Sequence, residues 1–355
     1  MHERLGAVMT SFAGWQMPLR YGSETAEHQA VRHAAGLFDL SHMGEIAVRG
    51  PGAGEALDYA LTGSLAALRP GRARYTMICA PDGGVLDDLV VYRLGEEEFL
   101  VIANAANAEV VFGSLVERAS GFDAAVADAT DEYALVAIQG PAAAGILGPL
   151  TDLDLAAMKY YAGAFGDVAG ARAWVARTGY TGEDGFEVFC RPSDAVGVWE
   201  SLAAAGSPAG LVPAGLAARD TLRLEAGMPL YGNELGPDLT PFDAGLGRVV
   251  KFDKPGDFVG RAALSTRAAA GSRLVLAGLT LQSRRVARHG YPVFADGVQA
   301  GTVTSGAPSP TLGHPIAMAY LNADPNPQDA VLTVGIRGEA VPVQLTDLPF
   351  YSRSR

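Results

Sequence analysis

The sequence has only two cysteines among its 355 residues, Cys79 and Cys190, and they form no Cys-x-x-Cys pair. Structural zinc sites and redox dithiols need closely spaced cysteines, so neither kind of site is expected. Both cysteines lie in apolar stretches, where a free cysteine is usually a small buried hydrophobic residue. We therefore predict two buried cysteines and no metal site.

Basic residues are also scarce, with 27 Lys and Arg against 39 Asp and Glu, which gives a net charge of −12. This balance excludes a broad nucleic-acid-binding surface and a polybasic membrane anchor, because both depend on clustered basic side chains. No apolar run approaches the ~18 residues of a membrane helix, and the N-terminus lacks the apolar core of a signal peptide. We expect a soluble, cytoplasmic protein, and the alanine-rich composition is in keeping with a bacterial source.

Several common catalytic signatures are missing as well: there is no HExxH, no GxSxG and no Walker loop. The glycines at 50–54 lack the third glycine of a dinucleotide-binding fingerprint and indicate a turn. His28 and His33 are five positions apart and do not share a helix face, so we expect surface positions for both rather than a metal pair. For His42 a structural role is favoured over a catalytic one.

What the sequence does contain is glycine (44) and proline (21), spread along the whole chain, which is typical of many short elements joined by tight turns. Residues 45–61 and 135–150 repeat one pattern, namely an apolar strand, Gly-Pro and an alanine-rich helix. This pattern has two interpretations. It is either a common type of connection, or the sign of two related units that bracket an inserted domain from about 50 to 140.

Closely spaced strands, rather than strands that alternate with long helices, favour an antiparallel α+β fold. The C-terminal part is strand and turn throughout and predicts a small all-β barrel or sandwich. We predict strands at 74–80, 85–92 and 99–104, helices at 105–119 and 211–226, a hairpin at 171–190 and the β-rich part after about residue 270.

The most informative segment is the strand that begins at Val85 and carries Asp87 and Asp88. Side chains alternate faces along a strand, so the two carboxyl groups point to opposite faces, and both faces are otherwise apolar. A carboxylate in apolar surroundings must be paired, hydrogen-bonded or protonated, which makes it a candidate acid, base or cation stabiliser. Alternatively, both groups cap the hairpin or pair with an arginine.

A second candidate is the segment RTGYTGEDGFE at 177–187, which places Tyr180 and Glu187 on opposite limbs of one hairpin. Glu187 shares its strand face with Phe189, and a carboxylate there can accept two parallel N–H bonds from a planar heterocycle while an aromatic ring stacks on it. The alternative is a solvated turn. Arg219 lacks an acid three or four positions away in its helix, so it either pairs across domains or binds an anionic ligand.

The densest basic cluster comprises Arg284, Arg285, Arg288 and His289. A solvated face, an anion site and a docking surface for an acidic partner are all compatible with it.

Together these segments resemble the T-protein family, the aminomethyltransferases of the glycine cleavage system. The resemblance runs nearly end to end and rests on eight motifs in the right order. They are SFAGWQMPLRY (11–21), GLFDLSHMGE (36–45), GGVLDDLVVY (83–92), RTGYTGEDGFE (177–187), PAGLAARDTLRLEAGMPLYGNEL (213–235), VVKFDK (249–254), DFVGRAAL (257–264) and GTVTSGAPSPTLG (301–313).

The resemblance implies a three-domain cloverleaf of mainly antiparallel sheets with flanking helices and a C-terminal barrel or jelly roll around a central folate pocket. The implied domains are 1–49 plus 141–265, 50–140 and 266–355. The implied reaction moves the methylene of an aminomethyl group, carried on the lipoyl arm of the H protein, to tetrahydrofolate and releases ammonia. The lipoylated H protein is then a transient partner of a monomeric enzyme, and tetrahydrofolate is its co-substrate.

The resemblance also implies roles for single residues. Asp88 matches the central catalytic acid, which assists the attack of a folate nitrogen and stabilises the iminium cation as ammonia leaves. Asp87 is the weaker candidate for this role. The implied folate-binding positions are Glu187 and Tyr180 at the pterin, Arg219, and, less firmly, Tyr75, Met43, Asn104 and Arg288.

Departures from the family pattern leave other readings open. The family usually has tryptophan where this chain has Arg248, and Arg353 or Arg355 of the tail could reach the glutamate part of folate. One alternative function is a folate-dependent demethylase on the same scaffold that acts on a small methylated substrate. A second is a folate-binding accessory protein for iron–sulfur clusters, which the stretch GMPLYGNEL disfavours because it lacks that group's cysteine motif.

Overall fold

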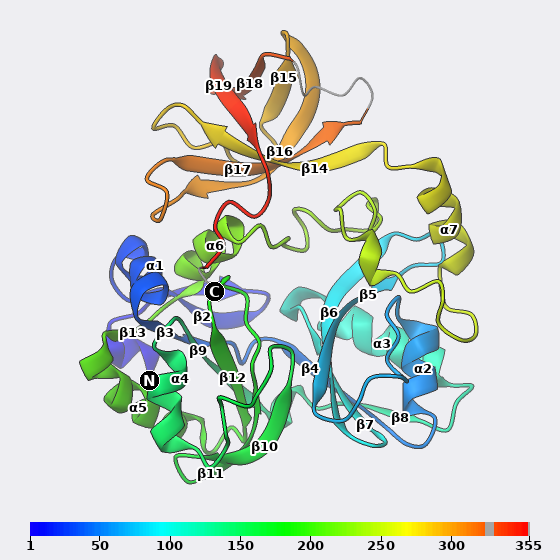
Figure 1. Ribbon diagram of the computed structural model, residues 1–355, viewed down its shortest axis with the longest axis vertical. Coiled ribbons are helices and arrows are strands. Elements are labelled where there is room, and N and C mark those ends of the chain that lie inside the picture. The colour runs from blue at the N-terminus through cyan, green and yellow to red at the C-terminus, as the bar shows by residue number, and fades with distance from the viewer. Residues whose placement is uncertain (324–329, 354–355) are drawn as a thin grey trace.

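The computed structural model describes residues 1–323 and 330–353. Its strands form a six-stranded sheet, a five-stranded sheet, a closed barrel and a two-stranded ribbon. Figure 1 shows three parts around a common centre, with the barrel at the top, the six-stranded sheet at the lower left and the five-stranded sheet at the lower right. The predicted α+β class, with mainly antiparallel sheets, flanking helices and a C-terminal barrel, is confirmed.

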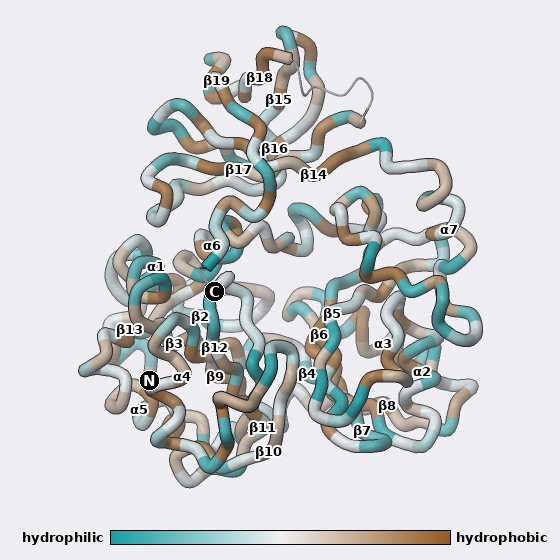
Figure 2. The backbone as a smooth tube through the Cα atoms, in the orientation of Figure 1, coloured by the Kyte–Doolittle hydropathy of each residue, from teal (hydrophilic) through white to brown (hydrophobic). Residues whose placement is uncertain are grey.

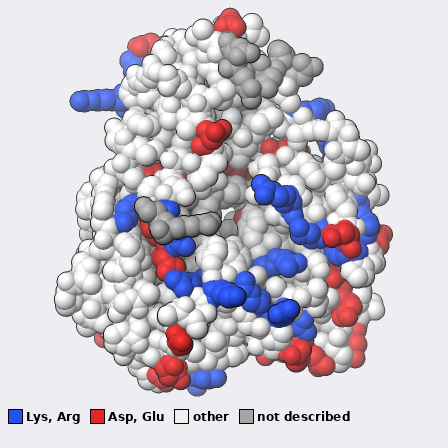
Figure 3. All heavy atoms as spheres, in the orientation of Figure 1, with Lys and Arg blue, Asp and Glu red and all other residues white. Residues whose placement is uncertain are grey.

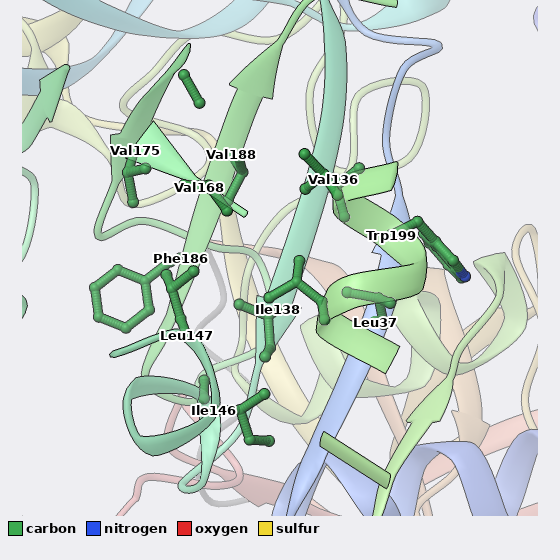
Figure 4. Close-up of a cluster of buried hydrophobic side chains, with 14 of the residues drawn as sticks. Leu37, Val136, Ile138, Ile146, Leu147, Val168, Val175, Phe186, Val188 and Trp199 are labelled. Atoms are coloured by element: carbon green, nitrogen blue, oxygen red, sulfur yellow. The ribbon is translucent and has the colours of Figure 1, made fainter. Parts of the chain in front are cut away.

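The six-stranded sheet has the strand order β10-β11-β12-β9-β3-β13, and only the β13–β3 pair is parallel. One of its faces packs on α4 and α5 through an apolar cluster that includes Ile138, Phe186 and Trp199 (Figure 4). The strands are β3 (Ala35–Asp39), β9 (Ala134–Gln139), β10 (Gly163–Val168), β11 (Ala171–Ala176), β12 (Gly185–Cys190) and β13 (Leu211–Pro213), with helices α1 (Glu24–His33), α4 (Ala143–Leu147), α5 (Ala195–Gly206) and α6 (Leu216–Glu225).

The five-stranded sheet has the order β5-β6-β7-β4-β8 and is antiparallel throughout. Along β6, Leu89 and Val91 face the helices α2 and α3 across an apolar core. Val90 and Tyr92 therefore face the other way, toward the six-stranded sheet. The elements are β4 (Gly44–Arg49), α2 (Ala53–Ala60), β5 (Arg72–Cys79), β6 (Val85–Gly95), β7 (Glu98–Ala103), α3 (Ala108–Ala119) and β8 (Ala125–Asp128).

The two sheets repeat one topology. In each, a strand leads through Gly-Pro into a helix, three strands follow as a meander, and the last strand of the meander pairs with the first strand of the unit. Gly50 and Gly140 occupy the same place in both units, with φ of 127° and 132°, and a Cβ on either would lie 2.6 Å or less from a backbone oxygen. Both positions therefore require glycine. The interpretation as two related units, one inserted into the other, agrees with this shared topology.

The strand pairing begins the inserted part at β4 and ends it at β8, whereas the sequence-based division puts its boundaries at residues 50 and 140. The predicted helix at 211–226 is wrong over its first five residues. Leu211–Pro213 form the edge strand β13, a place where proline's missing N–H costs no ladder bond. The backbone N–H of Gly215 then donates to Glu27 Oε2 over 2.9 Å, and α6 starts at Leu216.

The C-terminal part is a barrel that closes because β14 pairs with both β17 and β19. Its interior is filled by apolar side chains such as Leu279, Val303 and Val334, and Figure 2 shows hydrophobic residues along much of β14. Helix α7 (Arg261–Ala270) precedes the barrel, whose strands are β14 (Leu274–Leu281), β15 (Pro292–Ala295), β16 (Val298–Pro308), β17 (Pro315–Asn322), β18 (Leu332–Ile336) and β19 (Glu339–Thr346).

The second faces of the two open sheets meet in a shared apolar cluster, here called the interface cluster. The five-stranded sheet contributes Tyr92 and Leu100, the six-stranded sheet contributes Trp174 and Phe189, and α6 contributes Leu222. The ribbon of β1 (Val8–Phe12) and β2 (Trp15–Arg20) lies beside α6. Both cysteines are buried, as predicted.

Candidate functional site

A cavity of about 320 Å³ lies where the two open sheets and the segment after α6 come together. Seven of the eight positions predicted for catalysis or folate binding line it. These are Met43, Tyr75, Asp88, Asn104, Tyr180, Glu187 and Arg219.

A larger hollow of about 820 Å³ lies between α3 and the start of α7, and none of the predicted residues lines it. Two half-buried cations line it, and both already donate to backbone oxygens: Arg118 to Ala60 and Cys79 over 2.8 and 2.9 Å, and Arg261 to Gly256 and Phe252 over 2.5 and 2.7 Å. The smaller cavity is therefore the candidate site, because several ionisable side chains point into it without a full set of partners.

Asp88 reaches the cavity from β6, on the same strand face as Val90 and Tyr92. The hydroxyl of Tyr75 donates to its Oδ2 over 2.9 Å, and the amide of Asn104 donates to its Oδ1 over 2.9 Å. Burial raises the pKa of the Asp88 carboxyl, while these two donors act in the opposite direction. Among the described residues, the side chains that donate to this half-buried carboxyl are neutral, so no cation opposes the rise in its pKa.

Asp87 points to the opposite face of β6 and is fully buried. It accepts hydrogen bonds from the backbone N–H of Asn104, from the Asn104 amide and from the Asn107 amide, over 2.7–2.9 Å. Burial and the neighbouring Asp88 raise the pKa of Asp87 to about 7. Neither carboxyl group pairs with an arginine of residues 1–323 or 330–353, so pairing with an arginine is wrong for the Asp-Asp pair within this part of the chain.

Glu187 enters the cavity from β12, in the sheet opposite Asp88. Its Oε2 accepts from the hydroxyls of Tyr92, over 3.0 Å, and Thr178. Tyr180 lies in the loop before β12, where its hydroxyl donates to the backbone oxygen of Pro229. The segment is therefore not a solvated turn: Thr178 and Tyr180 donate hydrogen bonds within the protein, and both line the cavity together with Glu187.

Arg219 extends from α6 over the ring of Tyr180, with 4.8 Å between its Cζ and the ring centroid. Within residues 1–323 and 330–353 its guanidinium has no hydrogen-bond or ion-pair partner, and burial lowers its pKa. Of the two sequence alternatives, pairing across domains is thus not observed. A half-buried cation without such a partner is suited to an anionic or electron-rich ligand.

His42 is buried near the cavity, beside Phe12, and its pKa falls to about 4 through burial and the nearby charge of Arg219. The ring is thus uncharged at neutral pH, which agrees with a structural role.

Some lining residues were missed from the sequence, notably Tyr92, Tyr161, Thr178, Met228 and Tyr231. Two of them carried a signal. Tyr92 is four positions after Asp88 on the same strand face, and Thr178 belongs to the RTGYTGEDGFE segment. The others lie in connections whose path the sequence pattern does not reveal.

Arg288 does not line the cavity; it is exposed on the barrel and donates to the backbone oxygen of Gly306 over 3.4 Å. Arg248 is likewise exposed and outside the lining. Arg353 lies 3.4 Å from a carboxylate oxygen of Asp184, and Arg355 is outside the described residues.

The surface position expected for His28 is wrong, whereas His33 is exposed as expected. His28 is fully buried between α6 and the barrel, with ring nitrogens 2.8 Å from Thr221 Oγ1 and 3.1 Å from Glu225 Oε2. Its partners lie almost 200 positions away along the chain, so local spacing could not reveal them.

In the part of the chain that the structure covers, no group of three or more His, Cys, Asp or Glu side chains is arranged to hold a metal ion. No helix in that part is long and apolar enough to cross a membrane. Figure 3 shows Lys and Arg side chains gathered across the middle of one face, where the three parts meet, although the net charge is −12.

Comparison with known proteins places these features in a family. Residues 1–254 match the family described as the GCVT N-terminal domain, and residues 275–352 match the glycine cleavage T-protein C-terminal barrel domain. The aminomethyltransferases of Saccharopolyspora erythraea and Streptomyces coelicolor are 62% and 63% identical to this chain, over all of this chain and 97% and 96% of theirs. The crystal structure of glycine cleavage system aminomethyltransferase T from Bartonella henselae superposes with a TM-score of 0.92 at 38% identity, over 99% of this chain and 96% of that one. The chain therefore belongs to the glycine cleavage T-protein family, as its motifs predicted.

Proposed function

We propose that this chain is the aminomethyltransferase of a glycine cleavage system. It transfers the methylene of the aminomethyl group on the lipoyl arm of the H protein to tetrahydrofolate, and it releases ammonia. The observation that carries the proposal is the half-buried Asp88 carboxyl, which lines one cavity between the two open sheets together with Glu187 and Arg219. Family membership makes tetrahydrofolate the expected co-substrate.

The side chains that line the cavity have different roles in this proposal. Glu187 accepts N–H groups of the pterin ring, and Tyr180 and Arg219 provide an aromatic face and a cation beside it. Met43 supplies an apolar surface for the ring system. The proposed folate-binding set further includes Tyr75 and Asn104, whose donors orient Asp88.

Asp88 acts on the reacting atoms. The charged carboxylate first stabilises the cation that forms when ammonia leaves the aminomethyl carbon. It then takes the proton that a folate nitrogen loses as the new carbon–nitrogen bond forms. The carbon–sulfur bond breaks when the second folate nitrogen attacks the same carbon, and the proton lost by that nitrogen goes to the lipoyl sulfur. Burial raises the pKa of Asp88, which makes its carboxylate a stronger proton acceptor. The low polarity of the interface cluster behind it strengthens the interaction between the carboxylate and the cation.

The remaining parts of the proposal concern the setting of the enzyme. We include in it the division into domains 1–49 plus 141–265, 50–140 and 266–355, a monomer in the bacterial cytoplasm and transient contact with the lipoylated H protein. Arg288, which is exposed on the barrel outside the cavity lining, stays in the proposal as a folate-binding position.

The test is formation of methylenetetrahydrofolate from aminomethyl-loaded H protein and tetrahydrofolate, with wild type compared with Asp88→Asn. The variant should lose more than ~100-fold in kcat while its affinity for tetrahydrofolate is retained, because only proton transfer and charge stabilisation are removed. Turnover that survives the change would move the chemistry away from Asp88. A wild type that binds folate tightly but does not turn over this substrate would favour a folate-dependent demethylase.

A further inference from the structure

Asp87 does not line the cavity, yet two of its hydrogen bonds join it to a residue that does. Its Oδ1 accepts from the side-chain amide of Asn104 over 2.8 Å, and its Oδ2 accepts from the backbone N–H of the same residue over 2.9 Å. Asn104 follows directly after the last residue of β7 and lines the cavity. Two bonds from one carboxylate thus fix both the backbone and the side chain of a cavity residue.

The amide nitrogen of Asn104 bridges the two aspartates. It lies 2.8 Å from Asp87 Oδ1 and 2.9 Å from Asp88 Oδ1. The same nitrogen lies 3.2 Å from the backbone oxygen of Asp88. An amide NH₂ group has two hydrogens, and the two nearer acceptors are the carboxyl oxygens. The opposite rotation of the amide would set its oxygen against two carboxyl groups, which is unfavourable, so the orientation follows from the chemistry of the neighbours.

We propose that Asp87 is a positioning residue, which acts through Asn104 to hold the carboxyl group of Asp88 in its working orientation and to present the Asn104 amide oxygen to the ligand. This inference rests on the proposed function of Asp88. It also accounts for a second carboxyl group next to Asp88 in the sequence, 0% exposed, where the burial of a charge is unfavourable unless it is hydrogen-bonded.

The competing explanation is that Asp87 only fastens the start of α3. Asn107, which caps that helix, donates to Asp87 over 2.7 Å, so such a contact exists. The two roles differ in what a neutral replacement does. A purely structural tie lowers stability and leaves the turnover of folded enzyme unchanged, whereas a positioning residue lowers turnover without a matching loss of stability.

The experiment compares Asp87→Asn with wild type in kcat, in tetrahydrofolate affinity and in Tm. The inference predicts that kcat falls about 10- to 100-fold, the scale of losses when an outer partner of a functional side chain is removed. Affinity should change less than about threefold, and Tm should stay level or rise. The control is Asp58→Asn, which also removes a buried carboxylate of this unit, one that accepts from the backbone of Leu65 and Ala66. It should lower Tm and leave kcat unchanged.

A double-mutant cycle isolates the route through Asn104. Once Asn104→Ala has removed the bridge, Asp87→Asn should cost no further kcat. Equal losses of kcat with and without Asn104 would overturn the inference, and so would a lower Tm with unaltered kcat. If Asp87→Asn does not fold, Asn104→Ala alone decides, because wild-type kcat in that variant contradicts a bridge.

A readout that needs no turnover separates this inference from the proposed function. In wild type the Asn104 side-chain amide protons should exchange slowly with solvent in NMR spectra, and Asp87→Asn should speed their exchange at least ~10-fold. A wild type without aminomethyltransferase activity that shows this change would refute the function and support the positioning. Unchanged exchange would refute the positioning whatever the activity.

Discussion

At the scale of single residues, Glu187 is distinctive because only one of its two carboxylate oxygens is engaged. Tyr92 and Thr178 both donate to Oε2, and Oε1 has no partner among the described residues. The sequence-based expectation of two equal acceptors for a planar ligand is thus refined. Oε2 is held by the protein, and Oε1 is the acceptor available to a ligand in the cavity.

Replacement of Glu187 by glutamine tests this assignment. Glu187→Gln keeps the side-chain volume but turns a charged acceptor into a neutral one, and hydrogen bonds to charged groups contribute about 1.5–3 kcal/mol. We expect the dissociation constant for tetrahydrofolate to rise about 10- to 100-fold, as measured by calorimetry. The control Glu98→Gln alters a half-exposed partner of Arg49 and should leave the affinity unchanged. Equal affinity in Glu187→Gln would remove Glu187 from the binding site.

Asp87 gives a pH-dependent prediction. Its pKa is raised from 3.8 to about 7, so the folded state binds its proton more tightly than the unfolded state does. The stabilising effect of this proton is complete below about pH 4 and is lost as the pH rises through 7. The Tm of Asp87→Asn relative to wild type should therefore increase between pH 4 and pH 8. The exposed Asp131→Asn should show a flat difference over this range, and a flat difference for Asp87→Asn would refute the raised pKa.

At the scale of elements, α6 connects the cavity to the barrel. Arg219 at its cavity end faces Tyr180. At its other end the carboxylate of Glu225 is completely buried and accepts from Arg32 of α1 and from Thr311 of the barrel. Arg223, between them, donates to the backbone oxygen of Met228, which lines the cavity. Helix α6 thus fixes the positions of Arg219 and of the Met228 wall of the cavity relative to α1 and to the barrel.

Glu225→Gln should destabilise the protein by about 3 kcal/mol, because it removes the negative charge that is paired with the buried guanidinium of Arg32. Chemical unfolding at pH 7 measures this loss. Glu339→Gln, which breaks the exposed pair with Arg285, should cost less than about 1 kcal/mol. A similarly small cost for both variants would show that the buried network contributes no more than a surface pair.

The same network has a signature in acid. Burial alone would raise the pKa of the Glu225 carboxyl. Hydrogen bonds from His28, Ser309 and Thr311 outweigh this effect and lower that pKa from 4.5 to about 2. A depressed carboxyl pKa stabilises the fold above pH 4.5, and this contribution disappears as the pH falls toward 2. The difference in unfolding free energy between wild type and Glu225→Gln should narrow over that interval. A constant difference would contradict the depressed pKa.

The comparison of sequence with structure is also clearest at this scale. Strand alternation correctly placed Asp87 and Asp88 on opposite faces of β6, because the period of a strand is a local property. The burial of His28, the strand at 211–213 and the bridge through Asn104 could not be found in this way. Each depends on partners outside the local segment, 17 positions away for the Asn104 bridge and 193 for His28, and local patterns carry no information about them. Site residues were located chiefly through the family motifs.

At the scale of the whole molecule, the cavity belongs to no single part. Asp88 comes from the five-stranded sheet, Glu187 from the six-stranded sheet, and Met228 from the segment that follows α6. A ligand that touches all of these walls should therefore stabilise the molecule as a unit, by about 2.7 kcal/mol at a concentration 100 times its dissociation constant.

Hydrogen exchange tests this arrangement. With tetrahydrofolate bound, the backbone of the lining segments 177–184 and 226–231 should exchange more slowly, because both contact the ligand and neither lies in a regular element. The barrel hairpin around 295–299 should not change. Protection confined to one lining segment, or seen equally in the hairpin, would contradict a ligand held between the two sheets.

The interface cluster has a consequence for how such a site can vary. The carboxyl groups of Asp88 and Glu187 line one cavity but belong to separate sheets, and side chains such as Leu100 and Trp174 pack between those sheets and set their spacing. A change of volume there shifts one sheet as a rigid body, and it alters the reach between the groups without touching either of them. The length of ligand that the site accepts is thus encoded in apolar residues that never meet it.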